Sequence, residues 1–296
     1  MSRKKTLPFK PFLFIAPALF FYLAFFIWPY LQLIWLSLHE WNGFGDRIFV
    51  GFKNYADLAS DNQFRLAFQH NMSWSLAAIF IPVSLGLFLA LLLARTPMHG
   101  KVFFRAVYFM PQVISSISVA VVWGWIYHPT FGLLNQSLEL IGLGSLARGW
   151  LGDGNFALPA LFLAWSWIHY GFTMVIFIAA LEGIDEVYFE VAKIDGAGWW
   201  AQLRYVVLPF IARPLTTIIL VTAISSFQVF DLVFALTNGG PGRATIVLPL
   251  YMLTSAFTFH KIGYGAAIAV VLSLVVLAFS LILLRVRGSM KESVHA

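Results

Sequence analysis

Long stretches without a charged residue recur along this sequence and constrain its fold more than any other feature. The hydrocarbon core of a bilayer needs about 20 mainly apolar residues per spanning helix. Six uncharged runs approach or exceed that length: residues 12–38, 72–94, 106–138, 154–181, 214–230 and 262–284. None alternates apolar and polar residues strictly, and open sheet edges are excluded from lipid. We therefore predict an all-α integral membrane protein with six transmembrane helices.

The composition agrees with a membrane protein. Hydrophobic residues make up 60% of the chain and charged residues 11%, which excludes an ordinary soluble domain. The first run follows a basic start, as a secretory signal does, but it is too long and lacks a small-residue cleavage site. We therefore expect a retained anchor helix. The sequence contains no cysteine, which excludes a disulfide framework.

The distribution of Lys and Arg predicts which side of the membrane each loop faces. With six spans, one side carries 13 of these residues: Arg3, Lys4, Lys5, Lys10, Arg95, Lys101, Arg105, Lys193, Arg204, Arg213, Arg285, Arg287 and Lys291. The other side carries six: Arg47, Lys53, Arg65, Arg148, Arg243 and Lys261. Because basic residues accumulate on the cytoplasmic side, both termini are expected in the cytoplasm. The net charge of +6 then follows from topology and requires no nucleic-acid partner.

A seventh uncharged segment, residues 244–260, is not counted as a span. Pro249 and several hydroxyl side chains interrupt it, and a span there would place the C-terminus outside. Four regions are then expected: a cytoplasmic N-terminus with the anchor helix at 1–38, an external loop at 39–71, the main transmembrane domain at 72–285, and a cytoplasmic tail at 286–296.

The chain shows no motif for catalysis, metal binding or nucleotide binding. Its one Gly-Lys pair, Gly100-Lys101, is followed by Val102 and lacks the upstream glycine of a phosphate-binding loop. No His-Glu-x-x-His motif is present, and the histidines and carboxylates do not cluster at metal-ligand spacing. We therefore expect no enzyme activity and no cofactor, and any ATP would be hydrolysed by a separate protein.

Charges concentrate between the fourth and fifth spans, in residues 182–213, which hold five carboxylates and three basic residues. Val187, Val191 and Ile194 recur there at the spacing of one helix face, which predicts a short amphipathic helix. Gly196 follows as a stop, because glycine tolerates the left-handed conformation that ends helices. A second helical segment is expected over residues 199–207.

This stretch resembles the EAA loop of membrane subunits of binding-protein-dependent ABC importers, EAA-x3-G-x9-I-x-LP. Glu190-Val191-Ala192, Gly196, Val206 and Leu208-Pro209 stand at the spacing of that motif, with Val191 and Val206 as mild apolar departures. The resemblance implies the type I ABC importer transmembrane fold and a coupling helix seated in a groove of an ATPase subunit. The implied ATPase-coupling residues are Glu190, Ala192, Asp195, Gly196, Leu208 and Pro209.

Further segments look like carbohydrate permeases of the maltose, lactose and glycerol-phosphate uptake type. They are Phe230-Asp231-Leu232, Leu236 to Pro241, Tyr264 to Ala267, Phe104-Arg105 with Met110-Pro111, Trp123 to Trp125 with Gly132 to Asn135, and Phe49 to Tyr55. Together they favour the first of the two permeases that such systems pair. The implied partners are a second permease, an ABC ATPase dimer and an extracytoplasmic sugar-binding protein, with a small carbohydrate as cargo. The implied location is the cytoplasmic membrane of a bacterium or archaeon.

Two helical stripes are candidates for a sugar path between the helices: Trp165, His169 and Phe172, and Thr222, Ser225 and Ser226. Aromatic faces suit the C–H faces of sugars, while hydroxyl and imidazole groups bond sugar hydroxyls. The competing interpretation is that the hydroxyl side chains pack helix against helix and that the tryptophan faces lipid.

Asp231 is the one acid that we place within the membrane, near the outer end of the fifth span and opposite Thr222. Because burying an acid there is costly, its default interpretation is functional, as an outer gate or a sugar contact, although it would equally support the outer loop at Gly239 to Pro241. An ion-coupled secondary transporter and an intramembrane enzyme are the alternatives. The first commonly carries intramembrane carboxylates and internal repeats, and the second needs a catalytic pair or metal cluster.

Overall fold

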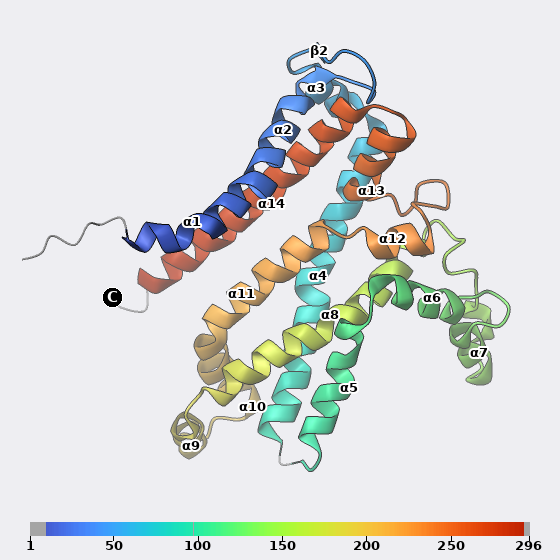
Figure 1. Cartoon of the computed structure of the whole chain (residues 1–296). Coiled ribbons are helices and arrows are strands. Elements are labelled where there is room, and N and C mark those ends of the chain that lie inside the picture. The colour runs from blue at the N-terminus through green and yellow to red at the C-terminus, as the bar shows by residue number, and fades with distance from the viewer. Residues whose placement is uncertain (1–9, 97, 293–296) are drawn as a thin grey trace, which may run out of the picture. The chain divides into compact units, whose positions relative to one another are not determined.

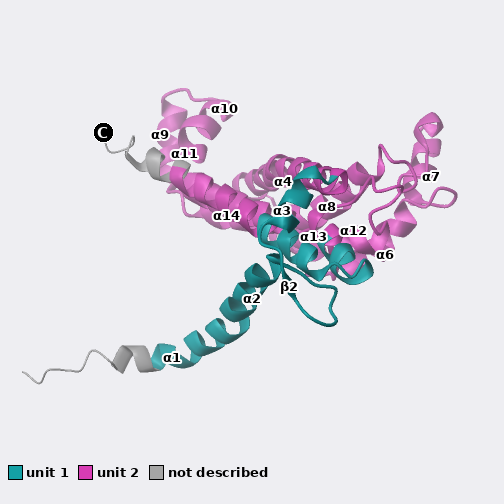
Figure 2. Ribbon diagram, turned by 90° about the horizontal axis from the view of Figure 1, so that it is seen from above, with its two compact units in different colours: residues 1–61, 252–271 teal, residues 62–251, 272–296 magenta. Residues whose placement is uncertain are grey.

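The computed structural model describes the backbone of residues 10–96 and 98–292 and the side chains of residues 14–96 and 98–285. The predicted cytoplasmic residues Arg3, Lys4 and Lys5 and the end of the predicted tail lie outside this part of the chain. The described chain is mostly helical, and the protein divides into two compact units, residues 1–61 with 252–271, and residues 62–251 with 272–296 (Figure 2).

The first unit contains short elements and the start of the last helix. They are α1 (Lys10–Tyr22), the π-helical η1 (Leu23–Ile27), α2 (Trp28–Ser37), β1 (His39–Glu40), β2 (Ile48–Phe49), α3 (Lys53–Ser60), η4 (Thr254–Thr258) and the first residues of α14 (Ile262–Glu292). The two strands form an antiparallel pair, with His39 opposite Phe49. Asn54 Nδ2 donates to the carbonyl oxygens of Ser37 and His39, which ties the loop after α2 to α3.

The second unit contains the long helices α4 (Asn62–Arg95), α8 (Ala157–Glu182) and α11 (Leu208–Phe227) together with shorter elements, in addition to the rest of α14 (Figure 1). The shorter elements are α5 (Lys101–Val113), α6 (Ser116–Ile126), α7 (Leu133–Leu140), η2 (Gly144–Leu146), α9 (Glu186–Ile194), α10 (Trp199–Gln202), η3 (Leu203–Val207), α12 (Asp231–Leu236) and most of α13 (Leu248–Leu253). Helix α4 packs along α8 and α11, and α5 packs along α8.

Within the described residues, five helical segments are long and apolar enough to cross a membrane. They are Phe14–Ser37, Asn62–Arg95, Ala157–Glu182, Trp199–Leu236 and Ile262–Arg285. The bent pair α5 and α6 gives a sixth span if the two helices count as one. The predicted all-α membrane fold is therefore confirmed. The segment 244–260 forms only short helices, α13 and η4, in agreement with its exclusion from the spans.

The third predicted span differs most from the structure. Residues 106–138 do not form one helix, because α5 and α6 meet at an angle of 100°. Ile114 has an extended backbone with ψ of 138°, which ends α5. Helix α6 begins at Ser116, with Ser115 as its N-cap. Further on, Pro129 and Gly132 separate α6 from α7. An uncharged run shows that a segment is apolar but does not show where its backbone turns.

Two helix ends also differ from the predicted boundaries. Helix α4 begins at Asn62, ten residues before the apolar run, because a helix can continue into polar residues beyond the bilayer. At the other end of the chain, α14 continues to Glu292, past the last apolar residue of its run. The predicted external loop 39–71 therefore holds two strands, α3 and the first turns of α4.

The crossing of α4 with α8 is closely packed at a glycine. A Cβ atom at Gly86 would overlap the Thr173 hydroxyl and lie 2.8 Å from the backbone nitrogen of Met174. Thr173 Oγ1 in turn donates to the Pro82 carbonyl oxygen at 2.9 Å. Small residues allow such backbone approach in membrane helices, where van der Waals packing replaces the hydrophobic effect.

Candidate functional site

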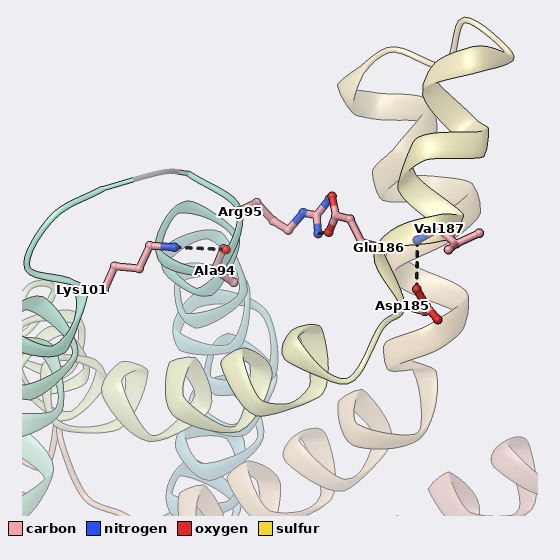
Figure 3. Close-up of polar contacts among 6 residues, drawn as sticks. All are labelled: Ala94, Arg95, Lys101, Asp185, Glu186 and Val187. Carbon is pink, nitrogen blue, oxygen red and sulfur yellow. Dashed lines mark hydrogen bonds and ion pairs between the residues drawn. The ribbon is translucent and has the colours of Figure 1, made fainter.

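Helix α9 carries the first part of the predicted coupling motif, and its ends are well defined. Asp185 Oδ1 accepts a hydrogen bond from the Val187 backbone N–H at 3.1 Å, which caps the start (Figure 3). Glu186 in the first turn and Lys193 in the last turn suit the helix dipole. Gly196 follows with φ of +73°. The predicted short helix with a glycine turn is confirmed.

One side of α9 is held by a phenylalanine that sequence reasoning missed. Phe189 is 1% exposed and belongs to a core cluster with Leu181 and Ile184 before α9 and Val207 and Ile211 after it. Burying an aromatic side chain of this size is among the larger single contributions to packing. The buried Phe189 side chain thus holds α9 against the core of the second unit.

The other side of α9 presents apolar side chains outward. Val187, Val191 and Ile194, which we call the α9 stripe, are all exposed, and Ile194 is 84% exposed. Glu190 is exposed too and lies three residues after Val187 and four before Ile194, so it borders the stripe. An exposed apolar stripe rimmed by charge is typical of a protein interaction surface.

The predicted second helical segment is present and leads directly into the next span. Helix α10 and the π-helical η3 cover Trp199 to Val207 and continue into α11, with Pro209 in its first turn. Leu208 packs against the core cluster, whereas Pro209 is exposed and Ala192 on α9 is half-buried. Asp195 is exposed at the end of α9. The six predicted coupling residues therefore lie in one continuous region, which runs from α9 through the turn after it to the start of α11.

Two arginines outside the motif contact this region. Arg95, the last residue of α4, forms a two-pronged ion pair with Glu186 at 2.8 and 3.2 Å (Figure 3). Its guanidinium group also lies over the Phe189 ring, 3.4 Å from the centroid. Arg105 on α5 pairs with Glu182, the last residue of α8. The sequence offered only the basic character of residues 95–105 as a signal for these contacts.

The aromatic stripe of the predicted sugar path is packed within the second unit. Trp165 is 4% exposed, and its ring meets that of Trp74 on α4 at a centroid distance of 6.0 Å. His169 stacks on Trp165 at 3.7 Å, and its Nδ1 atom lies 2.9 Å from the Trp165 carbonyl oxygen. Phe172 is half-buried. Trp165 does not face lipid in this structure, contrary to the competing interpretation.

The hydroxyl stripe of the predicted path joins the same helix, α4. Ser226 is fully buried, and its Oγ lies within hydrogen-bond distance of Ser75 Oγ at 2.9 Å and of the Ala223 carbonyl oxygen at 2.7 Å. Thr222 is buried, and Ser225 is half-buried. Ser75 and Trp74 are adjacent in α4, so this helix touches both stripes. The Ser226 contact is helix packing, and a contact of these six residues with sugar stays a prediction.

Asp231 does not lie on the same helix as Thr222, so the continuous helical spacing on which their expected opposite orientation depends is absent. Helix α11 ends at Phe227, and Phe230 leaves the helical conformation with φ of −139°. Asp231 then begins α12 and is exposed. The following loop is held by backbone hydrogen bonds from Asn238 to Val233 and from Gly240 to Thr237. A role for the Asp231 carboxylate in gating or loop support stays a prediction.

Across the residues that the structure describes, no group of three or more His, Asp or Glu side chains could hold a metal ion. The most distinct surface of the second unit is α9, which is anchored by Phe189 and Arg95 and presents an apolar stripe.

Comparison with known proteins identifies a family. The family model described as "Binding-protein-dependent transport system inner membrane component" matches residues 83–290. The chain is 36% identical over 284 residues to the "Probable ABC transporter permease protein YurN" of Bacillus subtilis (strain 168), covering 95% of this chain and 97% of that protein.

Two further relatives carry sugar names. The "Probable starch degradation products transport system permease protein AmyD" of Thermoanaerobacterium thermosulfurigenes is 33% identical, and the match covers 91% of each chain. The "Trehalose/maltose transport system permease protein MalF" of Thermococcus litoralis is 30% identical, covering 93% of this chain and 92% of that protein. A solved bacterial ABC transporter that imports alginate has the same fold, with a TM-score of 0.80, 20% identity and coverage of 93% and 94%.

Proposed function

The chain belongs to the binding-protein-dependent transport system inner membrane components and is a permease subunit of an ABC importer, and we propose that it carries sugar and docks its ATPase through α9. The sugar assignment rests on relatives named for starch degradation products and for trehalose and maltose. The docking assignment rests on one observation above all, the exposed α9 stripe beside Glu190.

The shape of α9 supports docking on a separate protein. Phe189 fixes one side of the helix to the permease, so the α9 stripe can be presented to a partner without loss of the helix. Gly196 leaves no side chain in the turn after the helix, and no other group lies within 4 Å of a Cβ there. Glu190 supplies a charge at the edge of the apolar contact, which favours one orientation of the partner.

In this proposal the permease has no cofactor, and ATP is bound and hydrolysed by the partner. The ATPase changes shape on binding ATP, and its hold on α9 differs between the two shapes. Because coupling requires a difference in free energy between two states, this difference biases the membrane helices toward outward or inward opening. The path for sugar then lies between this subunit and a second permease.

The remaining assignments also belong to this proposal. The subunit lies in the cytoplasmic membrane of a bacterium or archaeon, with both termini in the cytoplasm, as the distribution of Lys and Arg indicates. It pairs with a second permease, an ATPase dimer and an extracytoplasmic sugar-binding protein. A solved transporter of the same fold is in complex with an alginate-bound periplasmic protein, which supports the last of these partners.

Copurification tests the docking assignment. The tagged permease is purified in mild detergent from cells that express it with its neighbouring transport genes, and copurified proteins are identified by mass spectrometry. We expect an ATPase with a phosphate-binding loop, together with ATP hydrolysis that survives purification. Replacing all three residues of the α9 stripe with serine should release the ATPase, while the exposed variant Val102→Ser on α5 should retain it.

A permease that transports sugar in vesicles without any ATPase, driven by an ion gradient, would instead identify an ion-coupled secondary transporter. The cargo is tested separately, by competition among labelled mono-, di- and oligosaccharides in the reconstituted complex. We expect one of these sugars to block the uptake of the others. If the complex takes up none of the sugars tested, the carbohydrate assignment is contradicted. The docking assignment is not affected by that result.

A further inference from the structure

The last residue of α4 contacts α9 in two independent ways. Arg95 donates two hydrogen bonds to the two carboxylate oxygens of Glu186, and its guanidinium lies over the Phe189 ring. The two targets are three residues apart at the start of α9, so they are neighbours on one face of the helix. A single side chain thus holds both the position and the rotation of the short helix.

The charges of both helix ends favour this contact. Glu186 is in the first turn of α9, where the helix dipole favours a negative charge, and Arg95 is in the last turn of α4, where it favours a positive one. A planar guanidinium can face a carboxylate with two parallel bonds and also cover an aromatic ring. A lysine lacks this planar fork, so Arg95→Lys would lose the two-pronged contact.

Glu186 stands outside the motif that carries the resemblance, and Arg95 is 91 positions away along the chain. Arg105 and Glu182 form a second link nearby, between α5 and the end of α8. That link joins two long helices, whereas the Arg95 link joins a long helix to the helix that presents the α9 stripe. The two pairs therefore have different mechanical roles.

We propose that Arg95 is a positioning residue that fixes α9 to the end of α4, so that these two helices move as one body when the ATPase changes state. This inference rests on the proposed docking function of α9. The force on α9 then reaches α4 directly, and α4 contacts both candidate sugar-path stripes through Trp74 and Ser75.

Spin labels on the two helices test this movement. The sequence contains no cysteine, so Leu92→Cys on α4 and Lys193→Cys on α9, both exposed, give this subunit a defined label pair. The complex with cysteine-free partners is measured by pulsed EPR without nucleotide and after trapping with ATP and vanadate. We expect one distance, unchanged between the two states.

Arg95→Ala should uncouple the helices, so that the distance differs between the two states or its distribution at least doubles in width. Arg213→Ala on α11 is the matched control, because Arg213 is exposed and no ion pair of it is present among the described residues; it should behave as the unmodified subunit does. Identical distances for Arg95→Ala and the unmodified subunit in both states would overturn the proposal.

A charge exchange covers the case in which the single variant does not assemble. Arg95→Glu should lose the fixed distance or the complex, and Arg95→Glu with Glu186→Arg should restore it in part: the ion pair is rebuilt in reverse, but against both helix dipoles and without the guanidinium over Phe189. A double variant as defective as the single one would refute the positioning role. If the unmodified subunit copurifies without an ATPase, the docking function fails, and this result is distinct from a failure of the Arg95 link.

Discussion

The α9 end of the second unit and the interior where α4, α8 and α11 cross place similar residues in opposite surroundings. At the α9 end, valine and isoleucine side chains are exposed, while Phe189 of the same helix is buried in the core. In the interior, hydroxyl side chains such as those of Ser226 and Thr173 are buried and hydrogen-bonded to neighbouring helices. A contiguous exposed apolar patch and a buried polar residue are the informative cases in the two regions.

The difference teaches how each region is to be interpreted. Exposed apolar side chains outside the bilayer have a free-energy cost that a partner protein can remove, so they indicate function. Buried hydroxyls within the bilayer satisfy each other and bring helices together, so they do not by themselves indicate a sugar site. Four substitutions test this distinction, in order of expected effect.

Phe189→Ala should have the largest effect. Removing a buried phenylalanine costs about 3–5 kcal/mol, because the neighbouring side chains fill the cavity only in part. Thermal unfolding of the purified complex should shift to lower temperature, and the ATPase should dissociate. Tyr188→Ala, which removes an exposed aromatic neighbour whose ring is tilted against that of Phe210, should cost about 0.5–1.5 kcal/mol. Equal losses would mean that α9 is not seated through Phe189.

Gly86→Ala should destabilise the interior without touching the α9 surface. The added methyl group would overlap the Thr173 hydroxyl, and such overpacking typically costs about 1–3 kcal/mol. Thermal unfolding in detergent measures the loss. At the control position, Gly124→Ala, the nearest atom is Leu236 Cδ2 at 3.6 Å, so that helix should be unharmed. If Gly86→Ala leaves the unfolding temperature unchanged, the α4–α8 crossing is packed less closely than described.

Gly196→Asp should uncouple or disassemble the complex while the protein remains in the membrane. A residue with a Cβ in the left-handed conformation costs about 1–2 kcal/mol, and the turn would shift to relieve it. Gly198→Asp adds the same charge two residues away, where φ is −68° and space is also open. ATPase copurification compares the two. Normal ATP-dependent uptake by Gly196→Asp would contradict the docking assignment.

Ser226→Ala should have the smallest effect. Its hydrogen bond to Ser75 is worth about 0.6 kcal/mol by comparison with other membrane proteins, so stability should fall only slightly. Uptake of the sugar identified by competition should stay near that of the unmodified complex. If uptake falls strongly while the unfolding temperature is unchanged, Ser226 belongs to the sugar path after all.

Much of the architecture could be predicted because it depends on neighbours in the sequence. The uncharged runs predicted the apolar helices, and the spacing of Val187, Val191 and Ile194 with the glycine after them predicted α9. Helical period and glycine conformation are local properties, so they can be predicted without knowledge of the tertiary fold. The motif from Glu190 to Pro209 is local in the same sense.

Tertiary structure decided what local pattern leaves open. Phe189 and Val191 are both apolar residues of one short helix, and only the core formed by distant helices made the first buried and the second exposed. Likewise, the turn at Ile114 lies inside an uninterrupted apolar run. The pairing of Arg95 with Glu186 spans 91 positions. Burial, bending and long-range ion pairs depend on contacts between segments that are far apart in the sequence. The residues next to one another in the sequence do not determine those contacts.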